Sequence, residues 1–503
     1  MSNPVQANPH SYPIGHAAAR VQPGRTEPIA RGFIEFLGGP LGRHARVGTQ
    51  SWWTPLRVLL MAACVGLSAG FLSKFNCTQG SWSGHKQYVS ACYNDILPLY
   101  RSEGFADHHF PYAYSWVSDG QVRYMEYPVI TGMFQWFNAQ LTHVFYPLYH
   151  VLGGHALAEN GFYFAVTAFT LSLCWMVAVR IMVWLTGNRV WDTVLMAITP
   201  LVAIHAFTNF ELLVIMFAVA ALALAAQGKY RWAGVAIGLG TAAKLWPLFL
   251  LGAYLVILLR EKRLVPMAQM VGTTILSWLA VNLPIMFLFP VGWHEFFRLN
   301  SERGWEWTTI YAFASRTFGW HGFDHAGTYA VLNMFTLGMF LLSCLGIALI
   351  GWFAPQTPRV AQLAYLIVAV FLLWNKVWSP QYSLWLVPLA VLAVPRWRLV
   401  LCWGLIDALL WPILTWHMLG EKNMGIPHGP LDLAILGRDG MIVALGVIIV
   451  LEMYGKLPDR VRAAHGGIDP IGPGARRPAR QRAALQGGQR GVEKQRSSEE
   501  AKV

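Results

Sequence analysis

Long apolar segments recur through most of this chain, and they constrain its fold more than any other feature. Between residues 56 and 455, apolar runs of about 15 to 27 residues alternate with gaps that carry the charges, and about 20 such residues cross a bilayer as a helix. The composition agrees, because the 503 residues are 55% hydrophobic and only 13% charged, with a mean hydropathy of +0.41. A soluble protein of this length is less apolar. The sequence therefore predicts an all-α polytopic membrane protein.

The net charge of +13 does not indicate a nucleic-acid partner, because it is concentrated at the two ends of the chain. Residues 1–55 and 456–503 are basic and lack an apolar pattern, so we predict that both are disordered. Basic segments beside membrane spans stay in the cytoplasm and attract anionic lipid headgroups. We therefore predict two cytoplasmic tails, a membrane domain over 56–455, membrane lipids as neighbours and no nucleic acid.

Short basic gaps between the apolar runs allow the topology to be traced. With these gaps in the cytoplasm, we predict about 12 segments in the plasma membrane, an even number as two cytoplasmic tails require. The segment 233–243 is too short to cross at 1.5 Å per residue, so we expect a re-entrant half-helix that lines a cavity with 246–260. The predicted segments are 56–73, 161–186, 192–207, 211–227, 233–243, 246–260, 266–289, 327–353, 361–377, 382–396, 398–417 and 439–455.

The gaps on the opposite side of the membrane are longer and carry most of the remaining polar residues. The first of them covers 74–160. Loops of this length are usually functional. Its second half, 128–150, is amphipathic and aromatic, which is typical of a helix that lies on the membrane surface. We therefore expect an active site, if there is one, to face the outside of the cell.

One polar stretch, 374–385, lies between two apolar runs and reads Trp-Asn-Lys-Val-Trp-Ser-Pro-Gln-Tyr-Ser-Leu-Trp. Burying Lys376 and Gln381 at the edge of a membrane span costs several kcal/mol unless they find partners. A polar group kept at such a position is expected to face a ligand. For Lys376 the natural candidate is an anionic ligand.

The cysteines and histidines of the first long loop lead to two further predictions. Cys77 and Cys92 share this loop, and an oxidising exterior allows them to pair. Closing such a loop contributes about 3 kcal/mol and would brace the segment that carries Asp95. The adjacent His108 and His109 point to different sides, and no third ligand has suitable spacing, so we predict no metal site.

Several motifs together resemble one family of enzymes. Asp95 lies in the first long loop, Tyr127-Pro128 follows in the same loop, Asn209-Phe-Glu211 begins a span, and Gly238-Leu-Gly-Thr-Ala-Ala-Lys-Leu-Trp-Pro247 precedes another. With the stretch Asn375–Tyr382, they resemble the actinobacterial integral-membrane glycosyltransferases of family 87. This family has the C-type glycosyltransferase superfold and includes mannosyltransferases of phosphatidylinositol mannosides that use polyprenol-phosphate mannose. The resemblance covers roughly 56–455, and the family more often has Asp where this chain has Glu211.

The resemblance implies an inverting transferase that moves a sugar, mannose in the favoured case, from a polyprenyl-phosphate donor to a glycolipid or lipoglycan of the cell envelope. It implies no tightly bound cofactor. A base must take the proton of the acceptor hydroxyl, which Asp95 matches, and cations must stabilise the leaving phosphate. The expected phosphate-binding residues are Lys376, Lys244, Gln381, Tyr382 and Arg303, and the expected substrate-binding residues are Glu126, Tyr127, Asn209, Glu211, Trp305 and Trp307.

Other functions stay open at this point. Arabinofuranose on the same lipid carrier is an alternative sugar, and the chain could also be a lipid or solute transporter, or a scaffold of envelope assembly. A transporter should place Lys244 and Lys376 in one pathway that reaches both sides of the membrane. An enzyme should place Asp95 over a cavity, and a scaffold would leave that cavity filled.

Overall fold

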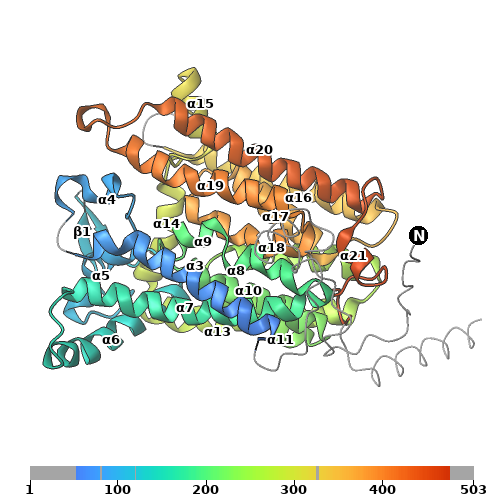
Figure 1. Ribbon diagram of the computed structural model, residues 1–503, viewed down its shortest axis with the longest axis horizontal. Coiled ribbons are helices and arrows are strands. Elements are labelled where there is room, and N and C mark those ends of the chain that lie inside the picture. The colour runs from blue at the N-terminus through green and yellow to red at the C-terminus, as the bar shows by residue number, and fades with distance from the viewer. Residues whose placement is uncertain (1–52, 80–81, 119, 325–327, 476–503) are drawn as a thin grey trace, which may run out of the picture.

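The computed structural model describes residues 53–79, 82–118, 120–324 and 328–475 as a bundle of helices with one small β-hairpin (Figure 1). Within these residues, six helices are long and apolar enough to cross a membrane. They confirm the prediction of an all-α, multi-pass membrane protein. The six helices are α3 (Pro55–Thr78), α7 (Glu159–Leu185), α13 (Leu264–Leu288), α16 (Ala330–Phe353), α19 (Trp397–Met418) and α20 (His428–Met453).

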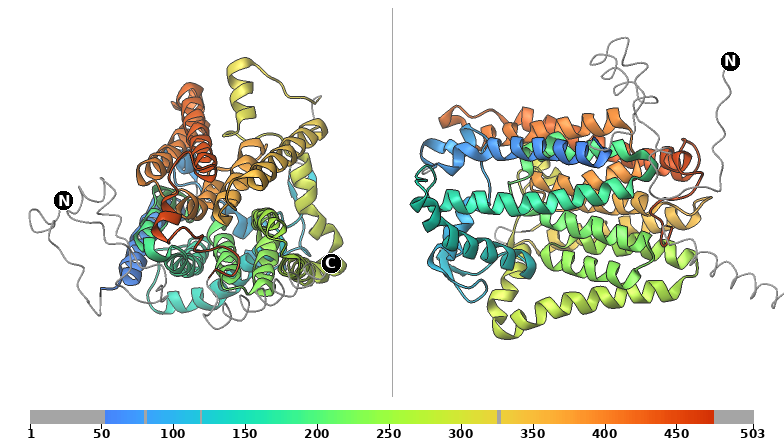
Figure 2. Two further views of the ribbon diagram at one scale, coloured as in Figure 1. Left: turned by 90° about the vertical axis from the view of Figure 1, so that its right-hand side faces the viewer. Right: turned by 60° about the horizontal axis from the view of Figure 1, so that its bottom comes forward.

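Shorter helices fill the spaces between the long ones, as the end-on and side views indicate (Figure 2). A 16-residue helix such as α10 is only about 24 Å long, less than the roughly 30 Å of a hydrocarbon core. The shorter helices are also more buried than the long ones. Only 11% of the most apolar window of α16 is buried, whereas most residues of α10 are buried. The shorter apolar helices are α10 (Glu211–Ala226), α11 (Tyr230–Ala243), α12 (Phe249–Arg260), α17 (Val360–Trp374) and α18 (Leu386–Ala393).

Three predicted segments differ from the helices that the structure contains. The segment 192–207, predicted as one span, is broken at Ile198–Thr199 into α8 (Val194–Ala197) and α9 (Pro200–His205), because Pro200 begins a new helix. The first segment does not end at residue 73 but continues to Thr78 in α3, which brings Lys74 inside the helix. The last predicted segment, 439–455, begins eleven residues earlier in the structure, at His428, the first residue of α20.

Two glycines one helical turn apart bring α11 against α13. A Cβ atom on Gly234 would lie 2.1 Å from the hydroxyl of Thr273, and one on Gly238 would lie 2.0 Å from the hydroxyl of Ser277. Small residues at this spacing let two membrane helices approach backbone to backbone. The contact fixes α11, whose C-terminal cap is Lys244 in extended conformation.

The first long loop is folded, and a disulfide closes its start. Cys77 at the end of α3 is bonded to Cys92, with Cα atoms 5.6 Å apart. Trp116–Ser118 and Gln121–Arg123 pair as the antiparallel strands β1 and β2, with Trp116 opposite Arg123. The helices of this loop are α4 (Lys86–Val89), α5 (Ile96–Ser102) and α6 (Val129–Val151), with 3₁₀ turns η2 (Ser83–His85) and η3 (Phe105–Asp107). A helix is present where one was predicted at 128–150, as α6, and its position on the membrane surface stays a prediction.

The second long connection follows α13 and is also helical. It contains α14 (Pro290–Glu302), which begins with a proline and has Arg303 as its C-terminal cap, and α15 (Ile310–Phe318). Thr309 caps α15 by accepting a hydrogen bond from the Ala312 amide at 3.2 Å. The remaining 3₁₀ turns are η4 (Gly187–Thr193), η5 (Trp246–Leu248), η6 (Pro380–Trp385) and η7 (Glu421–Asn423).

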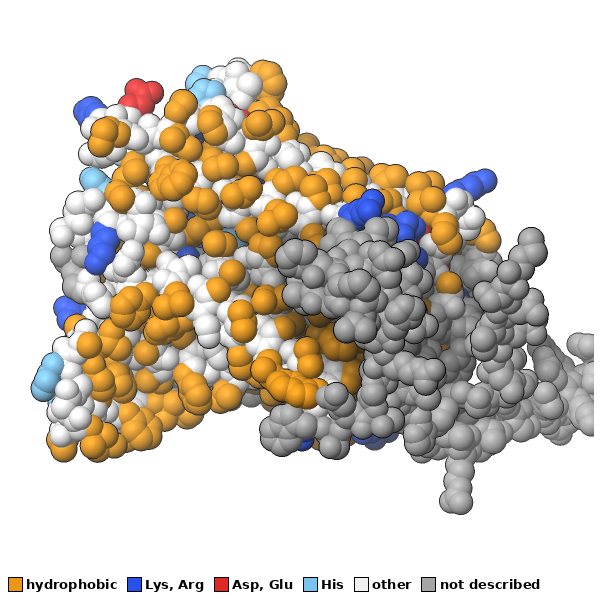
Figure 3. Space-filling model, viewed as in Figure 1, with side chains coloured by type: hydrophobic (Ala, Val, Ile, Leu, Met, Phe, Trp, Pro, Cys, Tyr) orange, Lys and Arg blue, Asp and Glu red, His pale blue; other side chains and the backbone are white. Residues whose placement is uncertain are grey.

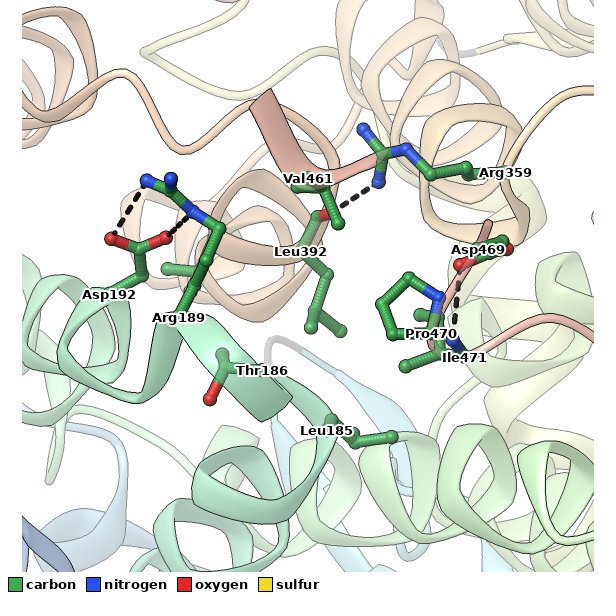
Figure 4. A pocket seen from close by; sticks show the side chains of 11 residues that line it. Leu185, Thr186, Arg189, Asp192, Arg359, Leu392, Val461, Asp469, Pro470 and Ile471 are labelled. Carbon is green, nitrogen blue, oxygen red and sulfur yellow. Dashed lines mark hydrogen bonds and ion pairs between the residues drawn. The ribbon is translucent and has the colours of Figure 1, made fainter. Parts of the chain in front are cut away.

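The chain after α20 returns across one end of the bundle, which corrects the prediction of a disordered segment from residue 456. Residues 456–475 are folded, with a short helix α21 (Arg460–Ala464), and Asp459 accepts a hydrogen bond from Arg359 at 2.7 Å. Arg359 and Asp469 face the same small pocket as Arg189 (Figure 4). The rest of that predicted tail, and the predicted tail at 1–55 up to residue 52, lie outside the described residues.

Apolar side chains cover the flank of the bundle, and charged side chains lie mostly near its two ends (Figure 3). Phe287, Met334 and Leu433 are each more than 70% exposed, at 75%, 74% and 73%. Apolar surface of this extent is expected of helices that face lipid. The basic gaps that contain Arg189, Arg359 and Arg396 meet α21 or the turn before it, at the end opposite α4, α5 and β1 (Figure 1).

Candidate active site

A cavity of about 380 Å³ lies at the end of the bundle where α4, α5 and β1 are found (Figure 1). Its size is that of an ordinary small-molecule site. Its walls come from the first long loop, the end of α14 and the segment 303–307 after it, the start of η6 with the residue before it, and α19, together with Asn209 and Lys244. Of the predicted site residues, those that line it are Asp95, Glu126, Tyr127, Asn209, Lys244, Arg303, Trp305, Trp307, Gln381 and Tyr382.

The carboxylate of Asp95 faces this cavity because a neighbouring residue caps the helix in its place. Asp95 occupies the N-cap position of α5, but its side chain makes no capping hydrogen bond. The side chain of Asn94 accepts the hydrogen bond of the Leu97 amide instead, at 3.0 Å. Asp95 therefore keeps its oxygens for other donors, and the hydroxyl of Tyr93 donates to Oδ1 at 2.9 Å.

Asn209, between α9 and α10, orients the other oxygen of Asp95. Its own Oδ1 accepts a hydrogen bond from the Phe210 amide at 2.6 Å, which turns Nδ2 toward the cavity. Nδ2 then donates to Asp95 Oδ2 at 2.8 Å and to the hydroxyl oxygen of Tyr127 at 2.9 Å. The backbone supports the same contact, since the Asp95 amide donates to the Thr208 carbonyl at 2.8 Å. Both carboxylate oxygens of Asp95 thus have a defined orientation.

Lys244 places a cation on the cavity wall and is held by an ion pair behind it. Its ammonium contacts Glu211, which is fully buried at the first turn of α10 and also accepts a hydrogen bond from the indole of Trp385. The same ammonium lies 4.4 Å above the ring of Tyr382. Glu211 does not line the cavity, so the structure places it as the partner of Lys244.

Arg303 is a second cation on the wall, and two carboxylates flank it. Its guanidinium lies 3.9 Å from Glu126 and 3.9 Å from Glu306. Burial raises the pKa of the Glu126 carboxyl, and the charge of Arg303 opposes that rise. Burial likewise raises the pKa of Glu306, although the hydroxyl of Ser379 donates to its carboxylate at 2.7 Å. The Arg303 side chain remains 45% exposed, so a ligand in the cavity can reach it.

Lys376, predicted to bind an anionic ligand, does not line the cavity. Its ammonium donates to the backbone carbonyl of Arg303, while its own carbonyl accepts from the Glu306 amide at 2.9 Å. Burial and the nearby Arg303 charge lower the pKa of Lys376 to about 8. Lys376 therefore contacts the backbone of the segment that carries Arg303, on the side away from the cavity. Its ammonium is repelled by the Arg303 guanidinium but can donate to the backbone carbonyl of the same residue.

The remaining predicted residues form an aromatic and amide border. The Trp305 ring stacks on Trp320 with centroids 5.2 Å apart, whereas Trp307 is 51% exposed. Gln381 is buried at the start of η6, next to Tyr382. Trp307 is the more accessible of the two indoles. Because exposed indole faces are suited to contact sugar rings, it is the better placed of the two to contact a sugar.

Sequence reasoning missed several residues of this cavity. Tyr93 lies two residues before Asp95, and Glu306 lies between Trp305 and Trp307, but nothing in the local pattern indicates that they face the cavity. Trp411 comes from α19, more than 300 residues after Asp95, and only the packing of that helix brings it here. In the described part of the chain, no three side chains of His, Cys, Asp or Glu are grouped so as to hold a metal ion.

Comparison with known proteins identifies a related family for part of the chain. The model of glycosyltransferase family 87 matches residues 141–380, a little under half of the sequence. Glycosyltransferase is thus the class of enzyme that this part resembles. The matched part includes Asn209, Lys244 and Arg303 but not Asp95, which lies before it.

Among solved structures, a crystal structure of ArnT from Cupriavidus metallidurans bound to undecaprenyl phosphate is similar over 80% of this chain and 78% of that chain, with 15% sequence identity and a TM-score of 0.39. No curated protein matches the chain.

Proposed function

We propose that this protein is an inverting membrane glycosyltransferase of the C-type superfold. It transfers a sugar from a polyprenyl-phosphate donor to a hydroxyl group of an envelope glycolipid or lipoglycan, and it needs no tightly bound cofactor. The observation that supports this most directly is one cavity with an oriented carboxylate, Asp95, and two cations, Lys244 and Arg303. The match of residues 141–380 to a glycosyltransferase family supports the same reaction class.

The chemistry follows from these groups. Asp95 takes the proton of the acceptor hydroxyl as that oxygen attacks C1 of the donor sugar. The bond from C1 to the phosphate oxygen breaks on the opposite face, and the polyprenyl phosphate leaves with the electron pair. Lys244 and Arg303 stabilise the negative charge that develops on this phosphate. Asn209 and Tyr93 hold the carboxylate of Asp95 in one orientation, so that a lone pair remains aimed at the acceptor.

Charge distribution supports an active site on the outer side of the membrane. The basic gaps with Arg189, Arg359 and Arg396 meet α21 or its flanking turn at one end of the bundle, and the cavity lies at the other (Figure 1). Positive loops favour the cytoplasm, so the cavity faces outward in this proposal. A donor carried on a lipid phosphate suits that side, where nucleotide sugars are absent.

Mannose is the sugar we favour, on the resemblance of the sequence motifs to mannosyltransferases. Arabinofuranose on the same lipid carrier is the second candidate. A transporter is less well supported, because Lys376 does not line the cavity with Lys244 and thus contributes no second cation to a pathway there.

The test uses the purified full-length protein in lipid vesicles. Labelled polyprenyl-phosphate mannose and polyprenyl-phosphate arabinofuranose are supplied separately, with envelope lipids extracted from native membranes as acceptors. Label should pass from one donor to a lipid product of inverted anomeric configuration. Label that remains on both donors, while the protein retains its fold, would contradict a transferase. Movement of intact donor across the vesicle bilayer would favour a transporter.

A further inference from the structure

The guanidinium of Arg303 stands between two carboxylates without a hydrogen bond to either. Its Nη2 lies 3.9 Å from Glu126 Oε2, and its Nη1 lies 3.9 Å from Glu306 Oε1. Both distances are longer than a hydrogen bond. Within the part of the chain that the structure describes, no acceptor is found at hydrogen-bond distance from this guanidinium. Its five N–H donors are therefore open to a ligand in the cavity that the side chain lines.

The two carboxylates beside Arg303 also face the cavity, and one of them is fixed in place. Glu306 Oε2 accepts a hydrogen bond from the Ser379 hydroxyl at 2.7 Å, which leaves Oε1 for the side of Arg303. Glu126 reaches the same guanidinium from the first long loop. Both side chains are about one third exposed, at 31% for Glu126 and 30% for Glu306, and both line the cavity. A ligand that binds Arg303 therefore meets two negative charges as well.

Negative side chains outnumber positive ones among the described residues that line the cavity. The three carboxylates are those of Asp95, Glu126 and Glu306, and the two cations are Lys244 and Arg303. Lys244 also has the buried carboxylate of Glu211 behind it. The wall thus carries no excess of positive charge. One negative charge on a ligand can be balanced at Arg303, but a second is opposed by the carboxylates on both sides, because like charges brought together cost several kcal/mol.

The charge of the lipid phosphate changes during the proposed reaction. A phosphate that joins a sugar to a polyprenyl chain is a diester and carries one negative charge. Transfer of the sugar leaves a phosphate monoester, whose charge at pH 7 is about −1.5 to −2 because its second pKa is about 6. A second charge beside Arg303 would either face Glu126 and Glu306 or force one of them to take up a proton. Both costs weaken binding.

We propose that Glu126 and Glu306 set the charge that this site accepts: they admit the singly charged phosphodiester of the donor and weaken the binding of the doubly charged polyprenyl phosphate that transfer leaves behind. The two glutamates thus favour release of the product and exclude sugars linked through a pyrophosphate. The inference rests on the proposed transferase activity, but it concerns binding and is measured without transfer.

The experiment titrates the full-length protein in detergent slightly above neutral pH, where a phosphate monoester is mostly doubly charged. The ligands are a non-transferable phosphodiester analogue of the donor and polyprenyl phosphate. In Glu126→Gln and in Glu306→Gln, affinity for polyprenyl phosphate should rise about tenfold or more, whereas affinity for the analogue should change much less. Glu302→Gln is the control, since Glu302 precedes Arg303 but pairs with Arg298 at 2.9 Å and does not line the cavity. It should change neither affinity.

A second measurement uses the wild-type protein alone and does not depend on the folding of a variant. The methyl ester of polyprenyl phosphate carries one charge and no sugar, and it should bind about tenfold more tightly than polyprenyl phosphate itself. Equal or weaker binding of the methyl ester would overturn the inference.

Two results with the variants would also overturn it. One is an unchanged ratio of the two affinities in both glutamine variants. The other is a loss of analogue affinity alone, because the glutamates would then bind hydroxyl groups of the sugar. Absence of transfer in a wild-type protein that shows the expected affinities would instead contradict the proposed function.

Discussion

The side-chain amide of Asn209 donates to the carboxylate of Asp95 at 2.8 Å, although 114 residues separate them in the chain. The hydroxyl of Tyr93 donates to the other oxygen, so the carboxylate is held on both sides. An aspartate in a free loop would rotate among several positions. Here the orientation exists before a substrate arrives, which lowers the entropic cost of bringing base and hydroxyl together.

Replacing Asp95 with Asn keeps the shape of the side chain and removes the proton acceptor. Transfer should fall by at least about a hundredfold, since general-base assistance typically contributes that much. The binding of a non-transferable donor analogue should be little changed. Asp107→Asn is a suitable control, because Asp107 is an exposed carboxylate in the same loop that does not line the cavity. Near wild-type turnover of Asp95→Asn would assign the base to Glu126 or Glu306.

Replacing Arg303 with Gln should weaken the binding of the donor analogue roughly ten- to a hundredfold, as the loss of a charge-assisted contact does. Titration of the donor analogue measures this effect. Arg298, on α14, provides a matched control, since it pairs with Glu295 and Glu302 and does not line the cavity. Equal donor affinity in wild type and Arg303→Gln would leave Lys244 as the remaining phosphate-binding cation on the wall.

Lys376 leads to a pH-dependent prediction. Because burial and the Arg303 charge lower its pKa to about 8, the ammonium is present below about pH 8 and is lost as the pH rises through that value. Its contact with the Arg303 carbonyl then weakens, and donor affinity should decrease above pH 8. Lys376→Arg keeps the charge at these pH values and should retain the affinity to at least pH 9, whereas Lys376→Met should bind weakly at every pH. An identical pH dependence in wild type and Lys376→Arg would show that another group titrates.

The ion pair between Lys244 and Glu211 can be tested through stability. Lys244→Met leaves the fully buried Glu211 carboxylate without its cation, which typically costs about 3–5 kcal/mol. The double variant Lys244→Met with Glu211→Gln should regain most of this stability, because a neutral amide replaces the unpaired charge. Thermal unfolding in detergent measures both effects. Stability should return in the double variant without a return of donor binding, since the cation on the cavity wall is still missing.

The disulfide between Cys77 and Cys92 should protect both thiols from alkylation until a reductant is added. Cys92→Ser should lower the thermal stability by about 3 kcal/mol and lower transfer as well, because the disulfide and Lys74 fasten the same segment. Cys64→Ser, at a free and exposed cysteine of the same helix, should change neither. Rapid alkylation of Cys77 and Cys92 in native membranes would mean that the bond does not form there.

Local patterns in the sequence were sufficient to predict the helical membrane fold, because a long run of apolar residues by itself indicates a helix in contact with lipid. The resemblance of several motifs to one family of enzymes, rather than local patterns, indicated ten residues of one cavity. The position of Lys376 was not predictable in the same way. A cation between two spans could face a ligand or a carbonyl, and only the fold of the segment around Arg303 decides between them.

Contacts between distant segments were the other feature that local patterns could not supply. Asn94 caps α5 and leaves the Asp95 carboxylate free to face the cavity. Asn and Asp have similar preferences for the helix N-cap, so the sequence does not show which of the two adjacent residues caps the helix. The first predicted segment ended at residue 73, yet the helix continues to Thr78 and buries Lys74. Tertiary packing overrides such a local signal when a partner, here the Tyr93 carbonyl, is in reach.

The returning segment after α20 determines how much of the C-terminus can be removed. The guanidinium of Arg359 is fully buried, with the carboxylate of Asp459 at 2.7 Å and that of Glu452 farther away at 4.0 Å, while the amide of Gly474 donates to the Ala225 carbonyl at 2.9 Å. A purification handle that replaces everything beyond residue 475 keeps all of these bonds. A handle that follows Tyr454 directly would leave the guanidinium without Asp459 at the far end of the bundle from the proposed catalytic cavity. The shorter protein should then be lost during extraction into detergent, even though every residue around Asp95 is intact.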